Sequence, residues 1–446
     1  MIQQFVKYIN QNNLIVSGNK VLLAVSGGID SVVMLDLFSK TTYSYAIAHC
    51  NFMLRGTESD EDEIFIKEIA SKYNIELFTH TCNAKKYAEL NKVSIQEAAR
   101  ELRYNWFNRV CLENNFTYVA IAHNSDDRAE TFFINLFRGA GLKGLKSIPL
   151  KRDNIIRPLL FASRSQIVEY ATSNNIKYRE DSSNISDYYL RNRIRHALIP
   201  ALKKTSPNFE NAIQKSIVNL TDSDLLLQSV IDEKKKSLFL SKADNTIHIS
   251  ITHLKQLSPF QVWMYYLLSE FGFDRQITNA ICLSIMEDYQ NVGKIYISSK
   301  YELLIDREYL IIRNLTQRIS TTKHSTISID QRSITHPVKL SIVRQKKNSS
   351  FVFNKSNKIA YFNLNKLSFP LTIRPWQKGD RIIPFGMNGS KLISDILIDN
   401  KVNKFEKDNT FVILSGKKII WLVGHRTSNE YRVKQNTKDV YVMEII

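Results

Sequence analysis

Short apolar runs alternate with segments of helical periodicity over the first half of the chain, and this alternation constrains the fold more than any other feature. The runs Val21–Val25, Tyr45–His49 and Tyr118–His123 each predict a buried strand. Apolar residues at helical spacing lie between them. Strands that alternate with helices favour a parallel sheet covered on both faces, so we expect an α/β domain.

Changes in composition divide the 446 residues into four parts. We expect an α/β domain over 1–215, a mainly helical domain over 216–315, a polar linker over 316–340 and a small β-rich domain over 341–446. The clearest signal in the last part is a hairpin, because two apolar runs flank Ser415-Gly416.

The chain carries a formal charge of +18, and much of it lies at one end. From Lys346 onward there are 18 lysines and arginines against 8 aspartates and glutamates. Such a concentration favours a nucleic-acid partner, although a solubilising surface is the alternative. The four cysteines are scattered, no run of about 18 apolar residues is present and no secretory signal is visible, so we expect a cytoplasmic protein without a membrane span.

A glycine turn directly follows the first predicted strand. It reads Ser26-Gly27-Gly28-Ile29-Asp30-Ser31 and leads into an apolar helical pattern. Two glycines let the backbone turn sharply, and the amides of the loop and the helix N-terminus then point at phosphate oxygens. Asp30 would repel phosphate unless a divalent cation bridges the two. The alternative is a plain strand–turn–helix connection in which Asp30 and Ser31 cap the helix.

A second candidate site follows the strand that ends near His123. Asp126, Asp127 and Glu130 share one turn of a predicted helix. Like charges at this spacing destabilise a helix by about 0.2–0.5 kcal/mol per pair, and a cation or an amine substrate would reverse that effect. The alternative is favourable pairing of the acids with the helix N-terminus. Ligands of α/β folds bind where strands end, which favours the site.

Arginines supply further candidates. Arg100 and Arg103 lie one turn apart on a predicted helix and can clamp a phosphate or a carboxylate, or can simply be solvated. Arg191, Arg193 and Arg195 form a cluster that we expect to face RNA, with surface solvation as the alternative.

These segments together carry a resemblance to known enzymes. The Ser26–Ser31 turn is similar to the PP-loop of the ATP pyrophosphatases, which cleave ATP between its α and β phosphates. The segments 94–104, 122–131, 138–145, 155–160, 191–195 and 374–382 narrow the resemblance to the tRNA(Ile)-lysidine synthetase family. Two departures are Cys50-Asn51-Phe52-Met53, where many relatives carry a second His and a Gly, and Asn124-Ser125, where His-Leu is commoner.

The resemblance implies a parallel-sheet PP-loop domain and a specific reaction. ATP, L-lysine and the wobble cytidine of an isoleucine tRNA with a CAU anticodon would give lysidine, AMP and pyrophosphate through an adenylated cytidine. The nearest alternative is a PP-loop tRNA thiolase, and a non-catalytic RNA-binding protein and an ATP-dependent amidotransferase are more distant ones. A homodimer is compatible with the sequence.

Roles follow from matching positions in that family. ATP would bind Ser26, Gly27, Gly28, Ile29, Asp30, Ser31, His49, Ala122 and His123. Asp30, Arg103, Asp127 and Glu130 would be catalytic, and Asp30 and Asp126 would hold Mg²⁺. The tRNA would contact Arg191, Arg193, Arg195, Arg374, Lys378 and Arg381.

Overall fold

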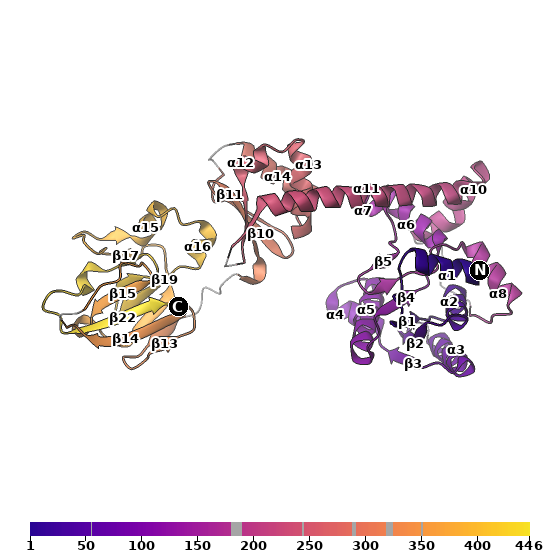
Figure 1. The fold of residues 1–446 in the computed structure, drawn as a ribbon, viewed down its shortest axis with the longest axis horizontal. Coiled ribbons are helices and arrows are strands. Elements are labelled where there is room, and N and C mark those ends of the chain that lie inside the picture. Colours follow the sequence, from indigo (N-terminus) through magenta and orange to yellow (C-terminus); the bar gives the residue numbers. More distant parts are fainter. Residues whose placement is uncertain (55, 180–189, 243–244, 288–290, 318–323, 349–350) are drawn as a thin grey trace. The chain divides into compact units, whose positions relative to one another are not determined.

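The computed structural model describes every residue except 55, 180–189, 243–244, 288–290, 318–323 and 349–350. It divides into two compact units, Met1–Ser229 and Val230–Ile446 (Figure 1). Helix α11 (Phe209–Leu238) carries the chain from the first unit into the second. Within the described residues, none of the helices has both the length and the apolar character needed to cross a membrane.

A six-stranded sheet forms the centre of the first unit, in the order β3-β2-β1-β4-β6-β5, and it is parallel except for β5. The three strands expected from the sequence are confirmed as β1, β2 and β4. The strands are β1 (Lys20–Ala24), β2 (Ser44–Asn51), β3 (Leu77–Thr81), β4 (Tyr118–Ile121), β5 (Lys151–Arg152) and β6 (Ile155–Ile156).

Helices cover both faces of this sheet, which explains why its strands are apolar throughout (Figure 1). Val21 and Leu23 of β1 face a core that includes residues of α1, α2, α3 and α8. Leu22 faces the opposite way, against Trp106 and Phe107 of α5. The helices are α1 (Ile2–Gln11), α2 (Ile29–Ser39), α3 (Thr57–Tyr73), α4 (Ala84–Asn91), α5 (Ile95–Asn114), α6 (Ser125–Phe137), α7 (Leu142–Leu145), α8 (Arg164–Ser173), α9 (Leu190–Arg193), the π-helical η2 (Ile194–Leu198) and α10 (Ile199–Thr205).

The direction in which successive strands are added to the sheet reverses at β1. From β1 the chain moves to β2 on one side and later returns to β4 on the other side. The loops that follow β1 and β4 therefore lie next to each other at the carboxyl edge of the sheet. This switch point is where open α/β sheets bind ligands, and it brings the glycine turn close to the start of α6.

The first part of the second unit contains the expected helices and also a sheet that the sequence did not predict. Its helices are α12 (Ile251–Lys255), α13 (Phe260–Leu268) and α14 (Arg275–Met286). The sheet is antiparallel, in the order β7-β8-β11-β10-β9. Its strands are β7 (Phe239–Ser241), β8 (Ile247–Ser250), β9 (Ile295–Ile297), β10 (Tyr301–Ile305) and β11 (Tyr309–Asn314).

Two antiparallel sheets form the C-terminal part and enclose a shared core around Trp421 and Tyr441. One has the order β12-β16-β19-β20-β21 and the other β13-β14-β22-β15. The strands are β12 (Ser325–Ile327), β13 (Ser333–Ile334), β14 (Leu340–Lys346), β15 (Ile359–Asn363), β16 (Leu371–Pro375), β19 (Phe411–Ser415), β20 (Lys418–Leu422), β21 (Arg426–Thr427) and β22 (Asp439–Ile445). The pair β17 (Arg381–Ile382) and β18 (Lys391–Leu392) and the helices α15 (Ile393–Asp399) and α16 (Lys404–Asp408) complete it.

The expected hairpin is confirmed, whereas part of the expected linker forms strands. Strands β19 and β20 pair across a turn at Ser415 and Gly416. Residues 325–327 and 333–334, which we assigned to the linker over 316–340, instead form β12 and β13. The Ile-Thr-Ser composition that suggested a polar linker also suits short edge strands.

The β19–β20 turn generates a stability prediction. Gly416 has a φ of +60°, which costs an L-residue with a branched Cβ about 1–2 kcal/mol. Replacing Gly416 with Val should therefore lower the thermal midpoint of the full chain, measured by circular dichroism. Gly416→Asn is the matched control, because asparagine tolerates this conformation. Equal midpoints for the two variants would contradict the prediction.

Candidate active site

The glycine turn between β1 and α2 is braced by its own serines and open at its surface. The Ser31 hydroxyl donates to the Gly28 carbonyl at 2.8 Å, and the Ser26 amide donates to the Ser31 hydroxyl at 3.2 Å. Gly27 has a φ of +93°, which explains why glycine is needed there. Ser26, Gly28, Asp30 and Ser31 all line one cavity, whereas Gly27 and Ile29 do not line it.

Asn124 joins this turn to the start of α6. Its side-chain amide donates to Asp30 at 3.1 Å. Its side-chain oxygen accepts from the backbone N–H of Asp127 at 3.0 Å. In return, the Asp127 carboxylate accepts from the backbone N–H of Asn124 at 3.0 Å. This reciprocal arrangement is a capping box. One side chain therefore fixes the distance between the glycine turn and the acidic turn.

The acidic turn is paired with arginines rather than exposed. Glu130 is almost fully buried, with a side chain 1% exposed, and it accepts from Arg191 at 2.7 Å and from Arg195 at 2.6 Å. Asp127 also accepts from Arg191, at 2.9 Å. Arg191 and Arg195 thus supply positive charge that offsets the repulsion between Asp127 and Glu130. Arg191 and Arg195 belong to this site, whereas Arg193 is exposed.

Asp126 points to a different neighbour from the other two acids. It accepts from the Arg164 backbone amide at 2.7 Å, and the Arg164 guanidinium is paired with Asp30. Burial raises the pKa of Asp30, and the nearby charge of Asp127 adds to that effect while Arg164 opposes it. Arg164 therefore contacts both carboxylates, Asp30 through its guanidinium and Asp126 through its backbone N–H. No group of three or more histidine, cysteine or acidic side chains is placed to hold a metal ion among the described residues.

The cavity beside the glycine turn has both apolar and cationic walls. It is lined by Ala24, Val25, Ser26, Gly28, Asp30, Ser31, Ala48, Cys50, Phe52, Arg103, Phe107, Ile121, Ala122 and His123. The Nε atom of Arg103 is buried and has no hydrogen-bond partner in the described structure. Arg103 lies one turn before Phe107 on α5, so it faces the cavity and is not one of the solvated arginines that the sequence left as an alternative.

The two predicted ATP-binding histidines differ in position. His123 lines the cavity, and Arg157 donates to its ring at 3.3 Å. His49 does not line it; its Nδ1 instead lies 2.9 Å from the Val25 carbonyl, directly before the glycine turn. Side chains alternate along a strand, so Ala48 and Cys50 face the cavity and His49 faces away. The sequence could not decide this, because strand β2 is apolar on both faces.

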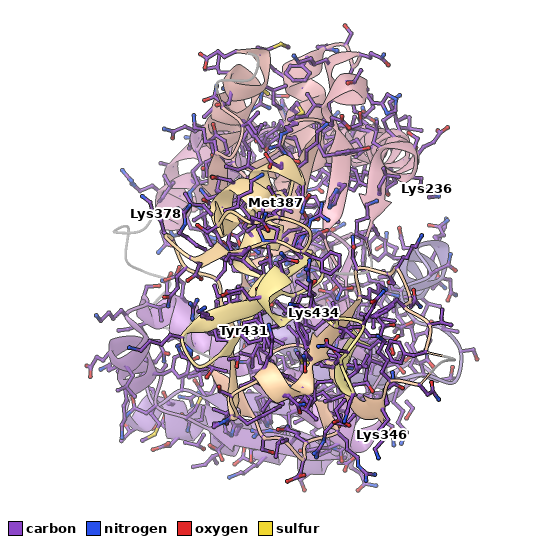
Figure 2. The ribbon with its side chains drawn as sticks, turned by 90° about the vertical axis from the view of Figure 1, so that its left-hand side faces the viewer. Lys236, Lys346, Lys378, Met387, Tyr431 and Lys434 are labelled. Carbon is purple, nitrogen blue, oxygen red and sulfur yellow. The ribbon has the colours of Figure 1, made fainter. Side chains whose placement is uncertain are left out.

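The three C-terminal candidates also differ. Arg374 makes two hydrogen bonds to Asp380, at 2.7 and 2.8 Å, and this pair holds the turn after β16. Arg381 is bonded to Ser390. Lys378 is exposed, as are Lys346, Arg432 and Lys434; Figure 2 labels Lys346, Lys378 and Lys434 on this part of the molecule. Lys378 and Arg381 are therefore exposed to a partner, whereas the Arg374 guanidinium is held by Asp380.

Sequence reasoning missed Asn124 and Arg164 as site residues. The signal for Asn124 is its place directly before a predicted helix, where asparagine is a common N-cap. Arg164 lies more than 30 residues beyond the acidic turn in the sequence and carries no motif, so only the fold brings it to Asp30.

Comparison with known families agrees with this geometry. Residues 1–202 match the family model described as PP-loop domain, residues 242–315 the TilS substrate binding domain, and residues 371–444 the TilS substrate C-terminal domain. A tRNA(Ile)-lysidine synthase of Parabacteroides distasonis is 35% identical over 447 residues, covering 100% of both chains. The chain belongs to the tRNA(Ile)-lysidine synthase family.

Other members of the family are similar over the same extent. The tRNA(Ile)-lysidine synthase of Bacteroides thetaiotaomicron is 34% identical over 447 residues, again covering 100% of both chains.

A solved structure of the U34-tRNA thiolase of Methanococcus maripaludis matches 50% of this chain and 78% of its own, with 21% identity and a TM-score of 0.42. That likeness is too low to bear on function.

The position of His123 generates a pH prediction. Burial, together with the charge of Arg157 and other arginines, lowers its pKa to about 3. An unfolded chain takes up this proton near pH ~6.5, so the folded state should lose about 2 kcal/mol of stability between pH 7.5 and pH 5 through this residue. The His123→Gln variant should lack that loss in urea unfolding. A His123 C2–H resonance that titrates near pH 6.5 would contradict the prediction.

Proposed function

We propose that this protein attaches L-lysine to C2 of the wobble cytidine of an isoleucine tRNA with a CAU anticodon, using ATP and releasing AMP and pyrophosphate. Full-length relatives named tRNA(Ile)-lysidine synthase support it. The observation that carries it is the single hydrogen-bonded unit made by Asp30, Asn124 and Asp127 beside one cavity. It combines a phosphate-binding turn with carboxylates that can take a proton from an amine.

The first step is adenylation of the cytidine. The O2 atom of the base attacks the α-phosphorus of ATP, and the bond to the β-phosphate breaks as pyrophosphate leaves. The amides of the glycine turn and the Ser26 and Ser31 hydroxyls bind the phosphates. The Arg103 guanidinium faces the same cavity, where it can stabilise charge that develops on the α-phosphate.

Magnesium fits this site through carboxylate oxygens. Mg²⁺ is usually held by one or two carboxylates together with substrate phosphates and water, and Asp30 and Asp126 are the two carboxylates that share Arg164. When bound, the ion would neutralise charge on the pyrophosphate. For Asp30 to bind the ion, the ion pair between Arg164 and Asp30 would have to break.

The second step is attack of the lysine ε-amine on C2. The new C–N bond forms, the C2–O bond breaks and AMP leaves. The amine has an ordinary pKa of about 10.4 and arrives protonated, so it needs a negatively charged partner that then accepts a proton. Asp127 and Glu130 are that partner. Neither carboxylate lines the cavity of this structure, and Arg191 and Arg195 cover both, so the amine would have to take the place of these arginines to reach them.

A tRNA thiolase is the alternative function. The cysteines of this chain suit thiolase chemistry poorly. A nucleophilic or sulfur-carrying cysteine needs a lowered pKa. Burial instead raises the pKa of Cys50 to about 12 and that of Cys111 to about 11. The acidic turn has no evident role in sulfur transfer, whereas it has one in binding an amine.

Glu130→Gln tests the assignment of the amine-binding carboxylate. The variant removes a buried negative charge while keeping the shape of the side chain. We expect incorporation of radiolabelled lysine into unmodified tRNA(Ile) transcript to fall at least about 100-fold in kcat/KM, which corresponds to about 2.7 kcal/mol. The matched control is Glu113→Gln, an exposed residue of α5. A correctly folded Glu130→Gln protein with wild-type incorporation would refute the assignment.

Exposed lysines of the C-terminal part generate a prediction about tRNA binding. Each phosphate contact contributes about one unit to the slope of log K against log salt. Lys378→Ala and Lys434→Ala should each reduce that slope by about one, measured by filter binding between 50 and 300 mM KCl. Lys67→Ala is the control, because this lysine pairs with Glu63 in the first unit. Unchanged slopes in both variants would place the tRNA elsewhere.

A further inference from the structure

Helix α11 packs against α6, the helix that carries the acidic turn. Ile213 and Ile217 of α11 share a buried apolar cluster with Ala129 of α6. The rings of Phe133 and Phe209 stack with their centroids 6.0 Å apart. Side chains in such a cluster interlock closely, so a shift of one helix displaces the other.

One polar side chain of α11 reaches the first turn of α6. The amide nitrogen of Gln214 donates to the Ser125 carbonyl at 2.9 Å. Ser125 is the first residue of α6 and comes two residues before Asp127. The contact therefore lies on the same turn as Asp127, one turn before Glu130, and adds a directional hydrogen bond to the apolar packing of the two helices.

Gln214 also satisfies a buried cation. Its side-chain oxygen accepts from the Arg128 guanidinium at 3.5 Å. Arg128 is only 7% exposed, its Nε atom has no hydrogen-bond partner, and none of the ion pairs between described residues includes it. A buried charge without a carboxylate partner is costly. The side-chain oxygen of Gln214 lowers that cost by accepting a hydrogen bond from Arg128.

The acidic turn is thus held from two directions. Arg191 and Arg195 bind its carboxylates, while Gln214 binds its backbone on the side of α11. Helix α11 then continues past Ser229, where the first compact unit ends, to Leu238. The segment that connects the catalytic unit to the rest of the chain is therefore hydrogen-bonded directly to the catalytic helix.

We propose that Gln214 is a positioning residue for Asp127 and Glu130. This inference rests on the proposed function, since it assumes that these carboxylates bind the lysine amine. Gln214 does not touch substrate; it sets where the first turn of α6 lies, and with it the point at which the amine is received. Displacing a reacting group by about 1 Å is enough to reduce a rate substantially.

Gln214→Glu is the informative substitution. Glutamate has the same length and can still accept from Arg128, but it cannot donate to the Ser125 carbonyl. We expect the KM for lysine to rise about tenfold, while the KM for ATP and the Kd for tRNA stay within twofold of wild type. Gln214→His should recover most of the loss, because a ring N–H can donate to the carbonyl.

Controls separate positioning from general destabilisation. Ser216→Ala lies on the same helix and removes only a hydrogen bond within that helix, to Ala212, so its lysine KM should match wild type. If Gln214→Glu lowers the thermal midpoint and leaves the lysine KM unchanged, the residue is merely structural and the inference is overturned. If Gln214→Glu does not fold, Gln214→Ala takes its place and must show the same rise in lysine KM.

The failure of the two proposals can be told apart. Wild-type enzyme that attaches no lysine to tRNA refutes the proposed function itself. Wild-type enzyme that attaches lysine, together with a Gln214→Glu variant of equal lysine KM, refutes only the positioning role.

Discussion

The hydrogen bonds of Asn124 are the interaction on which the rest of the site depends. Two loops leave neighbouring strands of a parallel sheet, and nothing in the sheet itself dictates how their side chains meet. Asn124 settles it by capping α6 with one atom and holding Asp30 with another. Because both contacts come from one short side chain, the glycine turn and the acidic turn are held together.

Charge balance explains why so many ionic groups can be collected in one place. Asp30, Asp127 and Glu130 would repel each other if unpaired, and Glu130 is buried where water cannot screen it. Arg164, Arg191 and Arg195 come from later parts of the chain and offset these charges. The site is therefore assembled only when the later segments fold back onto the sheet, so its electrostatics and its tertiary structure form together.

Much of this could be predicted from the sequence, and the remainder shows where local patterns stop being informative. The strands β1, β2 and β4, the glycine turn and the acidic turn each have a strong local signal. The strands β7, β8 and β9 were missed because each has only three or four residues. The strands β10 and β11 have ordinary lengths and were missed because the apolar pattern at Val262–Leu268 suggested helices for this whole region. The arginine pairs were missed for another reason: Arg164, Arg191 and Arg195 are 30 or more residues from their partners, and no spacing rule connects them. The orientation of His49 depended on which face of β2 turns toward the cavity, and an apolar strand does not reveal that.

The last strand has a consequence for how the chain is made. Strand β22 (Asp439–Ile445) lies between β14 and β15, so the strand that comes last in the sequence is an inner strand of its sheet. During translation β14 and β15 have no common partner until β22 has been made. The parallel-sheet unit can complete its core much earlier. A chain that lacks β22 would thus leave the facing edges of β14 and β15 unpaired, and unpaired strand edges favour aggregation.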